Sequence, residues 1–398
     1  MTACGAWRGA LSSGTGLGQS SPEKETAMQE TLVRALQAAM KMPGWAAHLG
    51  AIDPGAVALA ALPVLRKADL PAMQAARPPF AGFAPGAGRA RLFVSPGPIF
   101  EGVADGPDPW RFAPALAAAG ITDSDIVLNS FGYHLTPGGF IFDSAARALG
   151  CAVIPAGPGN TAQILEAVRA YSPAAYAGTP DFLKILLEAA DAAGIDAGCI
   201  TRAVVSGAAF PPSLRDWVAA RGITAVEAYG TAELGLIAHT VPGEAGMRLA
   251  QGIIVEIVRP GTGDPLPEGE IGEVLVTIPD PAHPVIRFSP GDMSAFLPGG
   301  RSIRGWLGRA DQTAKVRGMF IRPEQVAALG RAMPGLGRMR LVITRVAEQD
   351  AMELLAEGDG DASMLAEALR AATGLRGEAR FVPPGSLAAD GRIIDDRR

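Results

Sequence analysis

The segment EAYGTAELG, residues 227–235, gathers a tyrosine, a threonine and a glutamate in a chain that has only four tyrosines. The Tyr229 ring can stack on a flat ligand, and the Thr231 hydroxyl can donate to a phosphate oxygen. The Glu233 carboxylate is a hard oxygen ligand of the kind that Mg²⁺ prefers. The apolar run GITAV before this segment predicts a strand that ends in a turn, and such turns often present side chains to a ligand. The alternatives are a tyrosine packed at the strand end and a solvated turn carboxylate.

Composition and charge argue against several classes of protein. The chain has 398 residues, 48% hydrophobic and 19% charged, which is typical of a globular protein with two or three domains. A formal charge of -5 without a basic patch argues against a nucleic-acid partner. The apolar stretches of the sequence are too short to span a bilayer. Cys4, Cys151 and Cys199 lie far apart and match no metal-ligand spacing, which favours a reduced, cytoplasmic setting.

Strand-like and helix-like segments alternate between residues 91 and 231. This alternation predicts an α/β fold, with a large N-terminal domain of mostly parallel sheets covered by helices. Ligands bind beyond the carboxyl ends of such strands, where SGAAF (206–210) and YGTAE (229–233) fall. From Gln251 onward, short strands between Gly/Pro turns predict a small antiparallel β subdomain, followed by a small α+β domain.

The domain boundaries follow from the same reading. The polar, unpatterned start of the chain predicts a disordered tail at residues 1–28. We expect the large domain at residues 29–310 and the small C-terminal domain at residues 311–398.

Four segments occur in an order and spacing that are specific as a set: SGAAFPPSLRDWV (206–218), EAYGTAELG (227–235), PVIRFSPGDMSAF (284–296) and GRADQTAKVRGMFIRPEQV (308–326). Together they resemble the AMP-forming acyl/aryl-CoA ligases, most closely the phenylacetate–CoA ligase branch. The resemblance implies that ATP, Mg²⁺ and coenzyme A convert a carboxylic acid, expected to be aromatic, to an acyl-adenylate and then to a thioester. Members of the family often form homodimers.

The resemblance also assigns a nucleotide site. It implies that adenine stacks on Tyr229 and lies against the backbone of Gly207 and Ala208, where small residues allow close approach. Asp292 matches an aspartate that binds both ribose hydroxyls; its alternative is a surface-turn aspartate. Thr231 and Glu233 match the phosphate and metal positions. The remaining nucleotide positions are Glu227, Gly230 and Arg309, of which Arg309 matches a ribose and phosphate contact.

Other functional positions follow from the same resemblance. Asp311 matches the hinge about which the family rotates a mobile small domain between its two half-reactions. Lys315 and Gly318 match the channel for coenzyme A. His134 either positions the substrate carboxylate or is a hydrogen-bonded core histidine, and His239 is a weaker candidate for the same carboxylate. The expected acyl pocket consists of Phe131, Tyr133, His134 and Gly138.

Two departures from the family pattern predict weakened adenylation. The family wraps the β- and γ-phosphates with a Ser/Thr/Gly-rich loop that ends in lysine, whereas this chain has SPGPIFEG at residues 95–102. Its prolines lack N–H donors and Glu101 would repel phosphate, so Ser95 and Gly97 are the positions that can still serve. The family's C-terminal lysine is also missing; Arg392 is the nearest substitute, and its planar fork does not replace a mobile ammonium.

Three hypotheses remain open from the sequence. The leading one is an ATP-dependent acid–CoA ligase of the phenylacetate type. The second is a non-catalytic relative that binds AMP, an acyl-adenylate or an acyl-CoA as a sensor, which the two departures favour. The third is an adenylating enzyme that loads the pantetheine of a carrier protein.

Overall fold

The structure is a computed structural model that describes residues 22–84, 89–95, 98–208, 210–310, 314–316, 319–333, 335–346, 349–388 and 392–397. The chain divides into two compact units. The first consists of Met1–Pro290 with Ala295–Gly305, and the second of Gly291–Ser294 with Trp306–Arg398. The second unit therefore begins earlier than the expected boundary after residue 310.

The first described helix, α2 (Pro22–Ala39), corrects the expected disordered tail. Residues 22–28, which the sequence reading placed in that tail, already belong to the helix. The physical reason is local: Pro22 occupies the first helical position, where a missing N–H is harmless, and the segment EKETAMQE that follows consists mainly of good helix formers. Helix α3 (Pro43–Leu49) follows.

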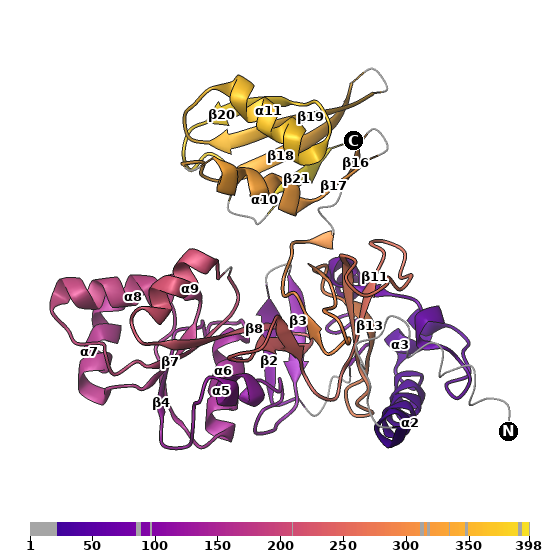
Figure 1. Ribbon diagram of the computed structural model, residues 1–398. Coiled ribbons are helices and arrows are strands. Elements are labelled where there is room, and N and C mark those ends of the chain that lie inside the picture. The colour runs from indigo at the N-terminus through magenta and orange to yellow at the C-terminus, as the bar shows by residue number, and fades with distance from the viewer. Residues whose placement is uncertain are drawn as a thin grey trace. The chain divides into compact units, whose positions relative to one another are not determined.

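The main sheet of the first unit has the strand order β15-β10-β9-β8-β7-β6-β4-β5 within the described residues (Figure 1). The strands from β5 to β8 run parallel, as the alternation predicted. At β9 the chain turns back and pairs antiparallel with β8. The strands are β4 (Ile126–Asn129), β5 (Ala152–Pro155), β6 (Ala175–Gly178), β7 (Arg202–Val205), β8 (Thr224–Thr231), β9 (Gly235–Thr240), β10 (Met247–Leu249) and β15 (Ser302–Ile303).

Helices cover both faces of the parallel strands, because successive side chains of a strand point to opposite faces. Val127 packs with α5 and α6, whereas its neighbour Leu128 packs with α7 and α8. Helix α8 begins with Pro180 and is ended by Gly194 in the left-handed conformation (φ 65°). The helices are α5 (Ala113–Ala118), α6 (Gly138–Ala148), α7 (Thr161–Tyr171), α8 (Pro180–Ala193) and α9 (Pro212–Ala219).

A second sheet in the first unit has the order β1-β13-β12-β11. Strands β11 (Ile254–Val258), β12 (Gly272–Ile278) and β13 (Val285–Ser289) are antiparallel, as expected for this region. The short strand β1 (Leu65–Arg66) was not expected, and it adds to the edge in parallel with β13. This pairing fixes the segment just before the one-turn helix η2 (Lys67–Asp69) and helix α4 (Leu70–Ala76).

Arg287 is a buried charge at the centre of this second sheet. Its exposed fraction is 2%, and it forms two 3.0 Å hydrogen bonds to the Glu256 carboxylate, which is 1% exposed. The remaining donors reach the carbonyl oxygens of Ala60, Leu62 and Gly263 at 3.0, 2.6 and 2.6 Å. Full satisfaction of the guanidinium allows a buried ion pair to persist, and here it ties β13, β11 and the chain before β1 together.

A separate antiparallel hairpin joins β2 (Arg91–Ser95) to β3 (Ile99–Val103). Phe93 pairs with Glu101 and Ser95 pairs with Ile99 across it. Gln74 of α4 fixes the hairpin, because its amide donates to the Phe100 carbonyl and accepts from the Phe100 N–H, both at 2.8 Å. Two hydrogen bonds to one backbone residue hold the neighbouring Glu101 in a defined place.

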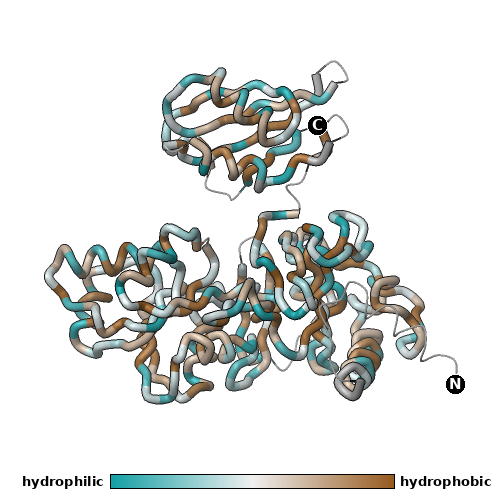
Figure 2. Tube along the Cα trace, in the orientation of Figure 1, coloured by the Kyte–Doolittle hydropathy of each residue, from teal (hydrophilic) through white to brown (hydrophobic). Residues whose placement is uncertain are grey.

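The second unit has its own core around the sheet β20-β19-β18-β21, with helices α10 and α11, as the α+β prediction required. Figure 2 shows hydrophobic segments along the strands of both units and hydrophilic segments at many of the loops. The elements are β14 (Met293–Ser294), β16 (Ala314–Val316), β17 (Met319–Ile321), α10 (Pro323–Ala332), β18 (Met339–Val346), β19 (Gln349–Glu357), α11 (Ala362–Thr373), β20 (Glu378–Val382) and β21 (Ile394–Asp396).

The predicted fold class is confirmed: helix-covered, mostly parallel strands, an antiparallel subdomain and a small α+β unit. No helix in the described part of the chain has the length and apolar character needed to cross a membrane.

We predict that Arg287→Met destabilises the first unit by about 3–5 kcal/mol, because it leaves the Glu256 carboxylate buried without its partner. Urea unfolding followed by tryptophan fluorescence measures this loss. As the control, Arg169→Met removes an exposed pair with Glu166 and leaves the midpoint nearly unchanged. Equal midpoints for the two variants would contradict the role given to Arg287.

Candidate active site

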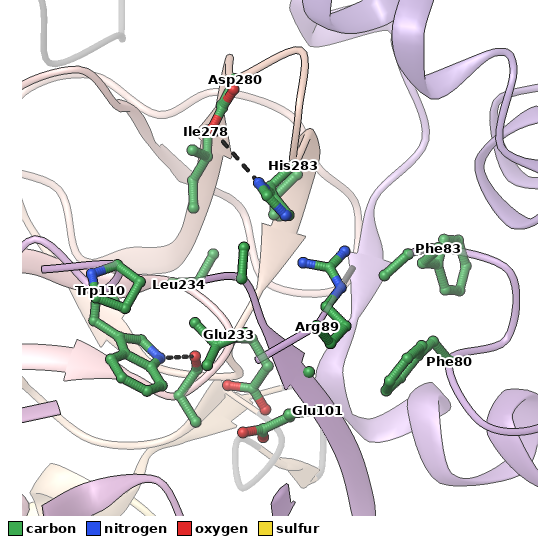
Figure 3. Close-up of a pocket in the computed structure, with 18 of the residues that line it drawn as sticks. Phe80, Phe83, Arg89, Glu101, Trp110, Glu233, Leu234, Ile278, Asp280 and His283 are labelled. Atoms are coloured by element: carbon green, nitrogen blue, oxygen red, sulfur yellow. Dashed lines mark hydrogen bonds and ion pairs between the residues drawn. The ribbon is translucent and has the colours of Figure 1, made fainter. Parts of the chain in front are cut away.

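A cavity of about 480 Å³ opens in the first unit beside Glu233 (Figure 3). It is lined by the hairpin β2–β3, the loop at residues 104–111, the turn between β8 and β9, and the ends of β12 and β13. Most of its wall is apolar. Aromatic side chains contribute much of this wall: Trp45, Phe80, Phe83, Phe93, Phe100, Trp110 and Phe288. Ionisable groups interrupt it at Arg89, Glu101, Asp105, Asp108, Arg111, Glu233, Asp280 and His283.

The turn between β8 and β9 carries Glu233 to the cavity. The Leu234 N–H donates to the Thr231 hydroxyl at 3.2 Å, and the Trp110 indole donates to the Ala232 carbonyl at 3.0 Å. Gly230 has no room for a side chain, since a Cβ there would lie 2.4 Å from the Gly235 oxygen. The glycines and the threonine of the motif therefore shape a tight turn, and the Thr231 hydroxyl keeps its own proton available for a further acceptor.

Lys67 is the partner of Glu233. Its Nζ lies 2.7 Å from Glu233 Oε1, and the Glu233 side chain is only 10% exposed. Lys67 comes from η2, far from Glu233 in sequence, and it arrives there because β1 pairs with β13. Sequence reasoning missed this residue as a site residue. The signal that could have found it was the segment LPVLRKADL, which resembles a family segment near the N-terminus.

Glu101 lies beside Glu233 at the same end of the cavity (Figure 3). The pKa of Glu101 is raised to about 8: burial is the largest cause, the charge of Glu233 adds to the rise, and Ser95 and Lys67 oppose it. At neutral pH Glu101 is therefore mostly an uncharged carboxylic acid. The repulsion toward phosphate that the sequence predicted for Glu101 is correspondingly reduced, because the charge responsible for it is largely absent.

Glu233 offers a buried carboxylate of the kind that binds a divalent cation. Its Oε1 contacts Lys67 Nζ at 2.7 Å, and the Glu101 side chain hydrogen-bonds to Ser95 and Glu233. Mg²⁺ takes one or two protein carboxylates and fills its other positions with water or phosphate oxygens. No group of three or more His, Cys, Asp or Glu side chains suited to a metal occurs in the part of the chain that the structure describes. The metal role of Glu233 stays a prediction.

Tyr229 is packed in the sheet. Its exposed fraction is 8%, and it belongs to a hydrophobic core that also contains Ile237. This position agrees with the alternative of a tyrosine packed at a strand end, and stacking on adenine stays a prediction. The other predicted adenine positions, Gly207 and Ala208, are exposed just after β7.

Gly207, an expected adenine position, lies next to Phe131, an expected acyl-pocket position. It has a φ of 74°, and a Cβ there would lie 3.6 Å from the Phe131 ring. Phe131 in turn stacks on Phe142, with ring centroids 4.4 Å apart. Phe131 and Gly207 are therefore neighbours, although 76 positions (207 minus 131) separate them in the sequence.

Tyr133 lies in the loop before α6, and Gly138 is the first residue of α6. The Tyr133 hydroxyl accepts a hydrogen bond from Asn129 at 2.8 Å, and burial raises the pKa of Tyr133. The tight contact falls on Gly139, where a Cβ would lie 2.6 Å from the Tyr133 ring; at Gly138 the nearest atom would be at an ordinary 3.7 Å. The glycine that the tyrosine requires is therefore the neighbour of the predicted one.

The two candidate histidines, His134 and His239, lie in different environments. His134 is exposed, so the alternative of a core histidine is wrong for this residue. His239 is 5% exposed, its Nδ1 lies 3.0 Å from the Thr240 carbonyl oxygen, and burial lowers its pKa. His239 is therefore a neutral, buried side chain of β9.

Glu227 is held by an ion pair. Arg215 of α9 lies 2.9 Å from the Glu227 carboxylate and also donates to the Phe210 carbonyl at 3.0 Å. Arg215 thereby links the strand β8 to the segment that follows Gly207 and Ala208. Burial raises the pKa of Glu227, and Arg215 opposes that rise.

Asp292 and Arg309 come together in the second unit. Asp292 is 7% exposed, and its carboxylate accepts from the Trp306 indole at 3.0 Å and from Arg309 at 3.3 Å. Gly291 is required next to them, because a Cβ there would lie 2.7 Å from the Arg309 guanidinium. Asp292 is thus not the surface-turn aspartate of the alternative. Tyr229 and Glu233 belong to the first unit, so the convergence of all three residues on one nucleotide stays a prediction.

The remaining predicted residues belong to the second unit, to β2 of the first unit, or to positions outside the described residues. Arg392 is exposed and lies 3.4 Å from Asp395. Lys315 pairs with Phe320 through the backbone of β16 and β17. Ser95 is buried at the end of β2, near Glu101. Gly97, Asp311 and Gly318 lie outside the described residues.

We predict that the free energy of unfolding falls as pH rises from about 5 to about 8, because the folded protein keeps a proton on Glu101 that the unfolded chain releases. Glu101→Gln flattens this fall, since the amide binds no proton. Urea unfolding across this range, with EDTA present, measures the slope. Glu244→Gln, which alters an exposed carboxylate paired with Arg248, keeps the wild-type slope. A slope unchanged in Glu101→Gln would sink the assignment of the proton to Glu101.

Comparison with known proteins finds a matching family model and similar sequences. Residues 131–282 match the AMP-binding enzyme family. The chain is 29% identical over 261 residues to a phenylacetate-coenzyme A ligase of Thermus thermophilus, covering 62% of this chain and 59% of that protein. It is 32% identical over 234 residues to the phenylacetate-coenzyme A ligase of Escherichia coli, covering 55% and 54%. The chain thus spans less than two thirds of the length of these relatives.

Solved structures share the fold. A 2-hydroxyisobutyryl-CoA ligase in complex with 2-HIB-AMP and CoA matches with a TM-score of 0.74 and 24% identity, over 95% of this chain and 93% of that one. ATP-bound MatB from Rhodopseudomonas palustris matches with a TM-score of 0.60 and 20% identity, over 79% and 68%. The sequence matches and the shared fold together make the chain similar to the AMP-binding enzymes and to phenylacetate-coenzyme A ligases.

Proposed function

We propose that the protein is an AMP-forming carboxylic acid–CoA ligase. A carboxylate oxygen attacks the α-phosphorus of ATP and pyrophosphate leaves, which gives an acyl-adenylate. The thiol of coenzyme A then attacks the acyl carbon and AMP leaves, which gives the thioester. The observation that carries the proposal is the meeting of Lys67 with Glu233 on the turn between β8 and β9, beside a cavity of about 480 Å³. We call this group of residues the Glu233 corner.

The relatives support this proposal. Curated proteins of similar sequence are phenylacetate-coenzyme A ligases. The similar structures hold an acyl-AMP with CoA, or ATP. We further propose an aromatic acid as substrate, a homodimer as the assembly and the cytoplasm as the location, on the resemblance and on the aromatic character of Phe131 and Tyr133.

The side chains at the corner divide the work of holding a triphosphate. The Thr231 hydroxyl and the Lys67 ammonium supply donors for phosphate oxygens, and Lys67 brings a cation to a site whose phosphate loop lacks one. Glu233, with Glu101 beside it, would hold Mg²⁺. When bound, Mg²⁺ neutralises phosphate charge. Lys67 thus compensates in part for the departure of SPGPIFEG from the family pattern.

Asp292 is the proposed ribose ligand. The Trp306 indole and Arg309 both donate to Oδ1, which fixes the orientation of the carboxylate that would accept from the ribose hydroxyls. Tyr229 is the proposed partner of adenine, with Gly207 and Ala208. Asp311 is the proposed hinge, and Arg392, Lys315 and Gly318 are the proposed contributions of the small domain to adenylation and to coenzyme A binding.

A second function is favoured by one observation. Glu101 places an acid side chain where a phosphate loop normally offers several N–H and hydroxyl donors, and this lack of donors disfavours a triphosphate more than it disfavours AMP. A sensor that binds AMP, an acyl-adenylate or an acyl-CoA would tolerate this change. Transfer to a carrier protein differs from the main proposal only in the thiol acceptor, so exchange of the acceptor in one assay separates those two.

We expect carboxylate-dependent exchange of pyrophosphate into ATP with at least one aryl acid from a panel that includes phenylacetate. The acyl-adenylate must form for exchange to occur, so the assay isolates the first half-reaction. Calorimetry with AMP and with ATP runs alongside. Binding of AMP without exchange for any acid would favour the sensor and reject catalysis.

We expect Glu233→Gln to lower the rate of exchange by about 100-fold to 1,000-fold, as loss of one transition-state electrostatic contact does. Lys67→Met should raise the KM for ATP and lower kcat, because it removes a phosphate-binding cation. Glu244→Gln is the matched control on an exposed carboxylate and keeps the wild-type rate. Exchange that is insensitive to both Glu233→Gln and Lys67→Met would remove this corner from the reaction.

A further inference from the structure

Trp306 contacts the buried Asp292 carboxylate although its own ring is half exposed. The indole N–H donates to Asp292 Oδ1 at 3.0 Å, whereas Trp306 is 48% exposed and lies outside the hydrophobic cores that the described residues form. Tryptophan is usually more deeply buried than this in a folded protein. The contact with Asp292, rather than burial in a core, therefore defines where this ring lies.

The backbone sets the distance between the two residues. Met293 donates its N–H to the Gly308 carbonyl and accepts from the Leu307 N–H, both at 2.9 Å. These two hydrogen bonds pair the segment after Asp292 with the segment after Trp306. Both segments belong to the second unit. The hydrogen bond from the indole to the carboxylate is therefore supported by a short ladder within one unit of the fold.

Trp306 and Arg309 act on the same oxygen of Asp292 in different ways. Arg309 lies 3.3 Å from Oδ1, its side chain is 33% exposed, and it brings a positive charge. The indole N–H is closer and neutral, and the ring has only two side-chain torsions to fix. A neutral donor orients a carboxylate without cancelling the charge that makes it a strong acceptor. Trp306 is therefore suited to set the plane of the carboxylate.

The plane of a carboxylate matters for a ligand with two neighbouring hydroxyl groups. The two hydroxyls of a ribose can both donate to one carboxylate only when the plane of that carboxylate faces the sugar. A site built to accept from hydroxyl groups discriminates strongly against an analogue that lacks them, because its buried acceptor then stays unpaired. A fixed Asp292 carboxylate therefore gives selectivity between sugars as well as affinity.

We propose that Trp306 makes the nucleotide site selective for ribose over deoxyribose, by holding Asp292 Oδ1 through its indole N–H. Trp306 is thus a positioning residue that acts through Asp292. The inference rests on the proposed function in taking Asp292 as the ribose ligand. It goes beyond that function by naming the residue that decides which sugar is accepted.

The test is calorimetry of the full chain with AMP and with 2′,3′-dideoxy-AMP. We expect the wild type to bind AMP about tenfold or more tightly than the dideoxy form. Trp306→Phe keeps a ring but loses the N–H, so it should lower this ratio about fivefold while the Kd for the dideoxy form stays nearly unchanged. Asp292→Asn should lower the ratio at least as far. Trp217→Phe, which alters a ring next to Lys184 and Arg221, is the matched control and keeps the wild-type ratio.

A double variant shows whether Trp306 acts through Asp292. In the Asp292→Asn background, Trp306→Phe should change the ratio no further, because the carboxylate that the indole orients is gone. Loss of affinity by the same factor for both nucleotides would indicate a merely structural role and overturn the inference. A wild-type ratio in Trp306→Phe, or a wild type that binds both nucleotides equally, would also overturn it. Circular dichroism and the melting temperature of each variant show whether it is folded.

The binding assay contains no acid, Mg²⁺ or coenzyme A, so it separates this inference from the proposed function. Absent pyrophosphate exchange, with a ratio that Trp306→Phe lowers, rejects the proposed ligase activity alone. Intact exchange with a ratio insensitive to Trp306→Phe rejects the present inference alone. A ratio unchanged in Asp292→Asn rejects Asp292 as the ribose ligand, and the inference with it.

Discussion

The bidentate ion pair between Arg287 and Glu256 is the interaction on which the candidate site depends. Its guanidinium also holds the carbonyls of Ala60 and Leu62, directly before β1, and so fixes where the N-terminal segment meets the antiparallel sheet. With β1 in register against β13, Lys67 emerges next to Glu233. A buried charge would be costly if any donor were unmatched. Here the matched donors set the geometry of a site in which Lys67 meets Glu233, a residue more than 160 positions further along the chain.

A second constraint is the balance of charge at the cavity. Glu233, Glu101 and Lys67 come from a β-turn, a hairpin and a one-turn helix, and each is held by backbone contacts of its own. The chain brings together one more carboxylate than it neutralises, and a proton on Glu101 restores the balance in the absence of a ligand. The stability of this corner therefore depends on pH.

Much of the fold follows from local pattern. The alternation of strands and helices between residues 91 and 231 predicted the parallel strands, and the turn residues after Gln251 predicted the antiparallel sheet. The tail was predicted too long, because composition at the N-terminus outweighed the helix formers after Pro22. Strand β1 was missed because two residues carry no periodicity, and its pairing depends on contacts more than 200 positions away.

The sequence by itself determined the motif turn, the position of Glu233 in it, and the resemblance to a family, since these depend on residue types and spacing within short segments. The tertiary structure alone decided that Lys67 and Glu101 are the neighbours of Glu233, that Tyr229 is packed in the sheet, and that Trp306 and Arg309 hold Asp292. The reason is physical. Burial and charge pairing act between residues that are close in space, and a linear pattern does not record which distant segments the core brings together.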